Sequence, residues 1–246
     1  LSMVADRHQG ETKVKEQRNL DINVEPTNLD FYDDMEKRSF KSIVLFSDKN
    51  KIALKNTLFY PEGGGQLGDT GIIEWNGKKS KVIDVQKIGD VVSHKIEGEI
   101  PSIGTKISGK VDNNRRSGLS KHHTATHLIG AAAREVLGNH IWQAGASKSL
   151  DRARLDITHH RRLTREIIDS IESKVNKLIL ENHLVTTKFH TREDADKKYG
   201  NTLYQGGAPK YKQVRVVEIP DIDAQACAGT HVSSTPKIGA VKVLRT

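Results

Sequence analysis

The chain has 246 residues, of which 35% are hydrophobic, and a formal net charge of +8 at pH 7. This length allows one large domain or two small ones, each with its own core. No apolar run approaches the roughly 20 residues that span a bilayer, and the first residues lack an apolar signal core, so the sequence predicts a cytoplasmic protein. The basic balance favours a polyanionic partner without establishing one, and the single cysteine excludes an internal disulfide.

The first half of the chain changes texture near residue 39. Residues 1–38 are charged, with little apolar periodicity, and are predicted to be a linker. Short β-type runs then follow one another: SIVLFS, KIALK, TGIIEW, SKVIDVQ, DVVSHKI and KISGKV. Asn76-Gly77 lies between the third and fourth runs and is a strong hairpin signal. We therefore expect a small antiparallel barrel or sandwich, a β-barrel-like subdomain over residues 39–112.

Helical periods begin after this region. Apolar residues recur at helical spacing over residues 113–138, where Gly138 is a plausible stop, and again after Thr164, a good N-cap. Strand-like runs surround the two helices: IWQAGAS, RARLDI, LVTTKF, QVRVVEI, DIDAQAC and GAVKVL. The predicted fold class is α+β, in which a two-layer α/β core over residues 113–246 follows the barrel.

Two pairs of potential metal ligands share the same spacing. His123 and His127 lie one helical turn apart, and Cys227, the sole cysteine, is followed at the same interval by His231. The histidine pair alone fits a chance surface arrangement, because the chain has 11 histidines. The alternative for the second pair is a buried apolar cysteine beside an unrelated surface histidine. Together they offer one thiolate and three imidazoles, a donor set that suits zinc. Thr124 stands where the metalloprotease helix needs glutamate, so peptide hydrolysis by that route is disfavoured.

Three further features have both a structural and a functional interpretation. The glycine run Gly63, Gly64 and Gly65 exposes backbone N–H groups that could approach an oxyanion or a ribose, although a flexible hairpin turn explains a bare triple glycine better. The basic residues Arg115, Arg116 and Lys121 could hold RNA phosphates, although such a run is more often a solvated face. Asp156 and Asp223 are candidates for orienting ligand imidazoles.

The ordered motifs FYPEGGGQLGDTG, HTATH and CAGTHV resemble the editing domain of alanyl-tRNA synthetase and the freestanding AlaX deacylases. The longer stretches IWQAGASKSLDRARLDITHH and VRVVEIPDIDAQACAGTH resemble the archaeal form in particular. The opening LSMVADRHQGE resembles the end of the tRNA-recognition region of that enzyme, which suggests an excised fragment. Ala228 departs from the glycine that is usual in the family, at a position between two ligands.

The resemblance implies a function and a cofactor. It implies a zinc-containing editing core that hydrolyses the aminoacyl ester of Ser-tRNA(Ala) and Gly-tRNA(Ala), with the remainder of the synthetase as a partner in the full-length enzyme. The positions that match the family's Zn²⁺ ligands are His123, His127, Cys227 and His231. Four protein ligands are typical of a closed structural site, whereas we expect an open or exchangeable position here.

The resemblance also assigns catalytic roles. Thr57 and Gln66 match positions implicated in handling the aminoacyl group. Our hypothesis is that Thr57 binds the serine hydroxyl and that Gly63, Gly64 and Gly65 stabilise the tetrahedral oxyanion. A zinc-stabilised tRNA-binding module without catalysis is the main alternative, and a zinc hydrolase of small amides or esters is the third.

Overall fold

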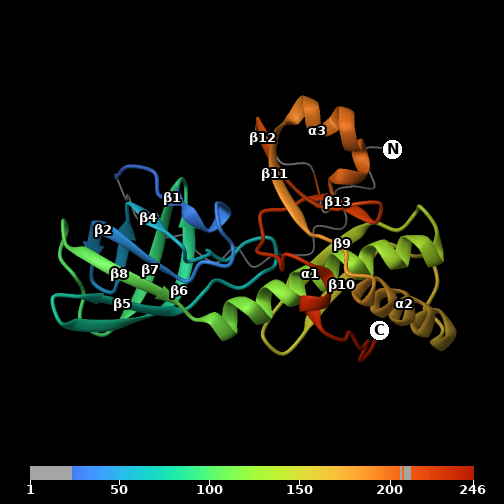
Figure 1. Cartoon of the computed structure of the whole chain (residues 1–246), viewed down its shortest axis with the longest axis horizontal. Helices are drawn as coiled ribbons and strands as arrows, with labels where there is room; N and C mark the ends of the chain where they lie inside the picture. The colour runs from blue at the N-terminus through green and yellow to red at the C-terminus, as the bar shows by residue number, and fades with distance from the viewer. Residues whose placement is uncertain (1–23, 206, 208–211) are drawn as a thin grey trace.

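The computed structural model describes residues 24–205, 207 and 212–246. Within them the chain is α+β: a closed six-stranded barrel lies at one end, and a second part holds the helices and two small sheets (Figure 1). One long helix runs from the barrel into the second part and so connects the two (Figure 1).

The barrel is antiparallel throughout and closes in the order β2-β3-β7-β6-β5-β8. The residues between β5 and β6, Asn76 and Gly77, both have positive φ, the requirement of a type I′ hairpin turn. The six runs expected in this region are all strands: β2 (Ser39–Asp48), β3 (Lys51–Leu54), β5 (Gly71–Trp75), β6 (Lys78–Ile88), β7 (Val91–Glu97) and β8 (Lys106–Val111). The predicted antiparallel barrel is therefore confirmed.

The described part of the predicted linker packs against the barrel. β1 (Asn28–Leu29) pairs in parallel with β4 (Asn56–Thr57), and the short 3-10 helix η2 (Asp30–Tyr32) follows it. The side chain of Phe31 is 1% exposed and belongs to the barrel core. Residues 28–31 thus pack on one side of the barrel, while residues 1–23 of the predicted linker lie outside the described residues.

Helix α1 (Asn113–Leu137) begins directly after the barrel, as its sequence predicts. The Asp112 carboxylate accepts hydrogen bonds from the backbone N–H groups of Asn114 and Arg115, and Gly138, with φ 108°, ends the helix. Arg116 corrects the expectation of a basic surface cluster, because its side chain is fully buried and paired with Asp69. The helix N-terminus is therefore anchored to the barrel.

The second part packs around α1. Helix α2 (Arg165–Leu180) starts where Thr164 accepts a hydrogen bond from Ile167 N–H, and its apolar side packs on α1. Strands β9 (Gln143–Lys148) and β10 (Ala153–Ile157) form an antiparallel hairpin. The other sheet has the antiparallel order β11-β12-β13, with β11 (Thr186–Thr191), β12 (Gln213–Ile219) and β13 (Asp223–Ala226).

Two elements differ from the prediction. The run GAVKVL forms no strand: Val241 N–H donates to the Asn176 side chain and Val243 N–H to that of Glu172, so α2 takes the place of a neighbouring strand. Helix α3 (Arg192–Tyr199) was not expected, because of its residues only Ala195 is buried and no apolar stripe marks it.

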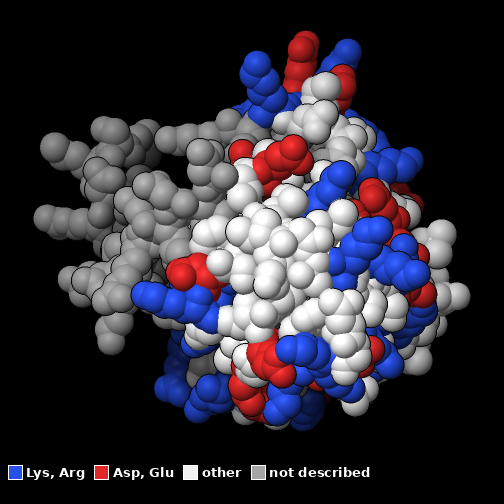
Figure 2. All heavy atoms as spheres, turned by 90° about the vertical axis from the view of Figure 1, so that its left-hand side faces the viewer, with Lys and Arg blue, Asp and Glu red and all other residues white. Residues whose placement is uncertain are grey.

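The surface gives no sign of a concentrated basic patch at the end of the barrel. Figure 2 shows that face, where Lys and Arg side chains stand around an uncharged centre and alternate with Asp and Glu. The excess of basic residues is therefore not gathered on this face. Among the described residues, no helix is both long and apolar enough to cross a membrane.

Candidate metal centre

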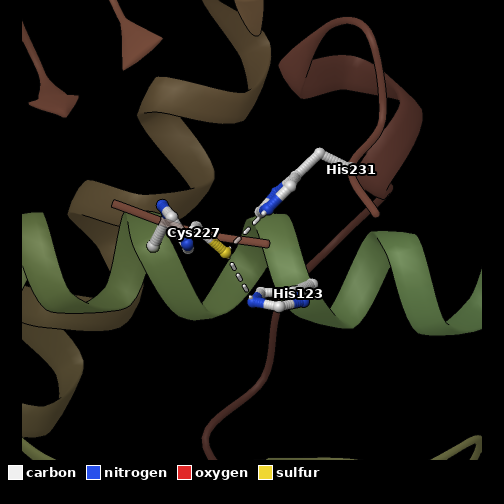
Figure 3. Close-up of side chains that lie close together, drawn as sticks. His123, Cys227 and His231 are labelled. Atoms are coloured by element: carbon white, nitrogen blue, oxygen red, sulfur yellow. Dashed lines mark hydrogen bonds between the residues drawn. The ribbon is translucent and has the colours of Figure 1, made fainter. Parts of the chain in front are cut away.

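The four ligand candidates lie together. His123 and His127 project from α1, and Cys227 and His231 lie on the loop after β13. The potential ligand atoms of all four lie within 4.8 Å of one another. Cys227 Sγ is 3.2 Å from His123 Nε2 and 3.4 Å from His231 Nε2 (Figure 3). The structure thus brings the two motifs, which lie about a hundred residues apart in the sequence, into one cluster.

The loop that carries Cys227 is held in place by hydrogen bonds from Arg215 and by close packing at Gly229. The Arg215 guanidinium donates to the backbone carbonyls of Cys227 and Gly229, at 2.7 and 3.0 Å. A Cβ on Gly229 would lie 2.0 Å from Cε1 of His123, so only glycine lets the loop pass over this ring. Gly229 therefore fixes the approach of Cys227 to His123.

A glutamine from the barrel orients the first imidazole. Gln66 Oε1 lies 2.7 Å from His123 Nδ1 and also accepts a hydrogen bond from the backbone N–H of Thr230, at 3.1 Å. Since a backbone N–H can only donate, this second bond identifies the amide oxygen, and His123 Nδ1 must then carry the proton. His123 Nε2 is left with its lone pair toward Cys227, as a metal ligand requires.

Thr124 orients the imidazole of His231 and fixes its tautomer. The Thr124 hydroxyl donates to the carbonyl of Ser120, at 3.0 Å, and accepts from the backbone N–H of Val232, at 3.2 Å. Its single proton is therefore used, so His231 Nδ1, 3.1 Å away, is the donor in their contact. His231 Nε2 is in turn unprotonated and faces Cys227.

The third imidazole faces a carboxylate. His127 Nδ1 lies 3.2 Å from Asp223 Oδ2, although the N–H direction does not meet hydrogen-bond geometry. Asp223 is held in turn by Arg134, whose Nη2 lies 2.6 Å from Oδ1. Asp156, the other expected carboxylate, instead pairs with the exposed Arg154. Of the two predicted orienting carboxylates, only Asp223 lies at the cluster.

The electrostatics favour the ligand forms of most of these groups. Burial raises the pKa of the Cys227 thiol, but His123 and His231 outweigh it and hold this pKa well below its usual value. Burial lowers the pKa of the His123 and His231 imidazoles. Burial also lowers the pKa of His127, yet Asp223 and the Cys227 thiolate raise it to about 9. A metal ion bound here would therefore have to displace the proton that His127 carries at pH 7.

The residues fit a zinc ion. Donor type agrees, since one thiolate and three imidazoles form a borderline-soft set. His123 and His231 present Nε2 to Cys227, and Nδ1 of each of the three rings faces a polar partner. The three histidine side chains are nearly fully buried. Such a set can supply four ligands, and the fixed orientation of the rings is the usual companion of a metal site.

The glycine run forms a tight turn beside the cluster. Gly63 and Gln66 pair as an antiparallel bridge, and Gly64 and Gly65 have φ of 57° and 74°, a type I′ turn. A Cβ on Gly65 would lie 2.1 Å from the carbonyl oxygen of Ala146 in β9, so this glycine also permits close packing. The turn places Gln66 against His123.

Only part of this turn is free to bind an oxyanion. The backbone N–H of Gly63 donates to the carbonyl of Gln66, at 3.0 Å. Those of Gly64 and Gly65 have no acceptor among residues 24–205, 207 and 212–246. Lys148 in β9 braces the turn, because its Nζ donates to Gly64 O at 3.0 Å and its backbone N–H to Gly65 O at 2.7 Å.

Known proteins match both parts of the chain. The family of class II (A) tRNA synthetases matches residues 3–115, and the threonyl and alanyl tRNA synthetase second additional domain matches residues 214–246. The alanine–tRNA ligase of Methanosphaera stadtmanae is 48% identical over 234 residues, which cover 92% of this chain and 26% of that protein. That of Methanopyrus kandleri is 43% identical over 253 residues, covering 99% and 28%.

The chain belongs to the alanyl-tRNA synthetase family. It corresponds to the editing region of these synthetases and spans about a quarter of the relatives' length, 26% and 28% in the two cases above. The match to the second additional domain contains Cys227 and His231, whereas His123 and His127 lie between the two matched stretches.

Thr57 lies on β4, beside the barrel, and neither of its polar partners, His94 and Phe59, is a metal-ligand candidate. Its side chain is buried, its Oγ1 lies 2.9 Å from His94 Nε2, and it accepts the backbone N–H of Phe59 at 3.0 Å. Burial lowers the pKa of His94 to about 4, so this ring is neutral at pH 7. The Thr57 hydroxyl therefore already has polar partners within the barrel.

The sequence analysis did not identify several residues that support the metal centre. They are Thr124, Thr230, Gly229, Lys148 and Arg215, which orient ligands or brace the segments that carry them. A signal existed for the first three, since they stand inside HTATH and CAGTHV beside the ligands. For Lys148 and Arg215 the sequence offers none, because Lys148 reaches Gly64 at a sequence separation of 84 and Arg215 reaches the Cys227 carbonyl across the β12–β13 hairpin.

Replacing Gln66 by leucine in this editing region is expected to weaken metal binding by about 10- to 100-fold, the usual cost of losing an outer partner of a metal ligand. The change removes the acceptor that fixes the tautomer of His123. Metal affinity measured by competition with a chromophoric chelator tests this. Gln86→Leu, the same change on the barrel strand β6, is the control and should bind metal normally. Unchanged affinity in Gln66→Leu would show that His123 needs no such partner.

Proposed function

We propose that this chain hydrolyses the aminoacyl ester of mischarged tRNA(Ala), with Ser-tRNA(Ala) and Gly-tRNA(Ala) as substrates. The observation that carries the proposal is the buried cluster of His123, His127, Cys227 and His231, oriented for metal binding beside a glycine turn, in a chain of the alanyl-tRNA synthetase family. The proposed partners are tRNA(Ala) and, in the full-length enzyme, the remainder of the synthetase.

Such an activity is needed because a small binding pocket discriminates poorly between amino acids of similar size. A pocket sized for alanine cannot exclude glycine by size, and comparable pockets reject an added hydroxyl only about a hundredfold. A second site that hydrogen-bonds the serine hydroxyl can discriminate by about 10⁴ to 10⁵ against alanine, which lacks it. Glycine differs from alanine only by a methyl group, a difference worth roughly 10- to 200-fold. We therefore expect a larger Ser/Ala than Gly/Ala hydrolysis ratio.

The metal, Gln66 and the glycine turn have different proposed roles in the hydrolysis. Zn²⁺ in such a ligand set supplies Lewis-acid polarisation of an oxygen or amine. Gln66 holds His123 in the tautomer that the metal requires. The backbone N–H groups of Gly64 and Gly65 are the proposed donors to the oxyanion of the ester, whereas that of Gly63 is engaged within the turn.

Thr57 is proposed to select serine, on the strength of its match to the family motif. Because its hydroxyl lies 2.9 Å from His94 Nε2, it has to exchange this partner for the serine hydroxyl when substrate binds. Thr57→Val keeps the shape and removes the hydroxyl. The Ser/Ala hydrolysis ratio is expected to fall toward the Gly/Ala ratio, and an unchanged ratio would mean that Thr57 is not the selector.

The first experiment is the release of amino acid from Ser-, Gly- and Ala-charged tRNA(Ala) by the whole chain, with its metal and after chelation. We expect fast loss of the seryl and glycyl esters, sparing of the alanyl ester, and loss of hydrolysis on chelation. Failure to hydrolyse any of the three esters, in a folded protein that retains its metal, contradicts the proposal for this chain.

A second candidate is a zinc-stabilised tRNA-binding module without catalysis. It is favoured by one observation, namely that the chain supplies four donors, enough to close a tetrahedron in the manner of a structural site. Circular dichroism of the chelated protein separates the two. Unfolding on chelation, with tRNA binding but no hydrolysis before it, supports the binding module, whereas retained fold with lost hydrolysis supports the deacylase.

A further inference from the structure

A second cluster of imidazoles lies at the open end of the β9–β10 hairpin, outside the centre described above. His140 stands shortly before β9, and His159 and His160 follow β10. One ring nitrogen from each of the three lies within 4.8 Å of the others. None of them takes part in the proposed hydrolysis.

The distances in this cluster are close to those of a coordination shell. His140 Nε2 lies 2.9 Å from His159 Nδ1, and the His159 and His160 ring centroids are 4.8 Å apart. Metal–nitrogen bonds of about 2.0 to 2.1 Å in a tetrahedron separate neighbouring ligand atoms by about 3.4 Å. The close pair must therefore open by a few tenths of an ångström and the third nitrogen must approach, which rotation of exposed side chains can supply.

The backbone already holds the two segments together. Thr158 Oγ1 donates to the carbonyl of His140, at 2.8 Å, and accepts from Trp142 N–H, at 2.9 Å. Thr158 N–H donates to Trp142 O at 2.9 Å. The segments that carry His140 and His159 are therefore already held together before an ion binds. This lowers the entropic cost of binding.

Exposure and charge suit an accessible site. His140 and His160 are exposed and His159 is half-buried. Neutral imidazole is the form that binds metal. The positive charge of Arg161 opposes a cation, so we expect weaker affinity than at the buried centre.

We propose that His140, His159 and His160 form a second metal site, which takes a divalent transition cation such as Zn²⁺, Ni²⁺ or Cu²⁺ through three imidazole nitrogens and leaves its other coordination positions open to solvent. Imidazole donors suit these ions. The site lies between the end of α1 and the start of α2, so an ion there ties together the two ends of the hairpin segment that joins these helices. This site does not depend on the proposed editing function.

Cobalt distinguishes the two sites, because only the Cys227 centre can give a sulfur-to-cobalt charge-transfer band. The chelated whole chain is titrated with Co²⁺ at protein concentrations that give stoichiometric binding. We expect two equivalents, of which the second adds absorption without the sulfur band. His159→Gln is expected to bind one equivalent and to keep the sulfur band, and His140→Gln should do the same. His183→Gln, which alters a histidine paired with Glu181, is the control and should bind two.

Two results would overturn the proposal. Binding of one equivalent by the wild-type chain would mean that the three imidazoles are only a hydrogen-bonded surface cluster. A second equivalent that survives in both His159→Gln and His140→Gln would place it elsewhere. Because these side chains lie at the surface, circular dichroism is expected to show both variants folded. A further variant, Cys227→Ala, should retain the equivalent that lacks the sulfur band.

Discussion

Replacing His127 by glutamine is expected to release the metal and to lower the proposed ester hydrolysis by more than about 100-fold. The expectation rests on comparison with outer partners, whose loss costs roughly 10- to 100-fold, since losing a ligand removes a bond to the ion itself. The change also leaves Asp223 without the imidazole that lies 3.2 Å from it. Metal content by mass spectrometry and release of serine from Ser-tRNA(Ala) are the two measurements.

His94 offers a matched control for this experiment. It is a fully buried histidine, as His127 nearly is, but it lies in the barrel beside Thr57. His94→Gln should therefore disturb the barrel and leave the metal in place. If both variants lose metal equally, the loss reflects general destabilisation, and if His127→Gln keeps a full complement of metal, His127 is not a ligand.

The parts of the centre that the sequence predicts are those encoded locally. His123 and His127 are recognisable because a helix brings residues four apart onto one side, and Cys227 and His231 repeat the spacing. The outer partners are different, since Gln66 contacts His123 at a sequence separation of 57 residues and Thr230 at a separation of 164. No local pattern reports such a contact, so these roles had to come from the structure.

In the fold, too, the elements that local sequence signals encode were predicted, and those that depend on tertiary contacts were not. The barrel strands alternate inward and outward residues, and α1 and α2 begin at N-caps, so local signals sufficed for both. GAVKVL has the same strand-like alternation, but Asn176 and Glu172 of α2 satisfy its backbone instead of a strand. Local propensity predicts an element only where tertiary contacts agree with it.

Arg116→Met is expected to lower the free energy of unfolding by about 3 to 5 kcal/mol, the usual cost of removing one partner from a buried ion pair. Arg116 Nε lies 3.0 Å from Asp69 Oδ2, and both side chains are 0% exposed. Without the guanidinium, the backbone N–H of Tyr60 is the one hydrogen-bond donor that the described part of the chain still offers to the Asp69 carboxylate. Urea unfolding followed by circular dichroism measures the loss.

Arg115→Met is the control that distinguishes loss of the buried ion pair from loss of any basic residue at the start of α1. Arg115 Nε donates to the carbonyl of Gly68 at 2.9 Å, a partly exposed bond whose loss is worth about 1 kcal/mol. Arg115→Met should therefore cost much less than Arg116→Met. Equal losses in the two variants would contradict the assignment. In a double-mutant cycle, Asp69→Asn combined with Arg116→Met should cost less than the sum of the single changes, because the two residues interact directly.

The same pair joins the ligand helix to the glycine turn. Asp69 follows the turn that carries Gln66, and Arg116 precedes His123 on α1, so the ion pair fixes the distance between the segments that meet at the metal centre. Arg116→Met is therefore expected to weaken metal binding as well as folding, whereas Arg115→Met should leave metal affinity near that of the wild type. A destabilised Arg116→Met that retained full metal affinity would show that the centre holds its geometry without this anchor.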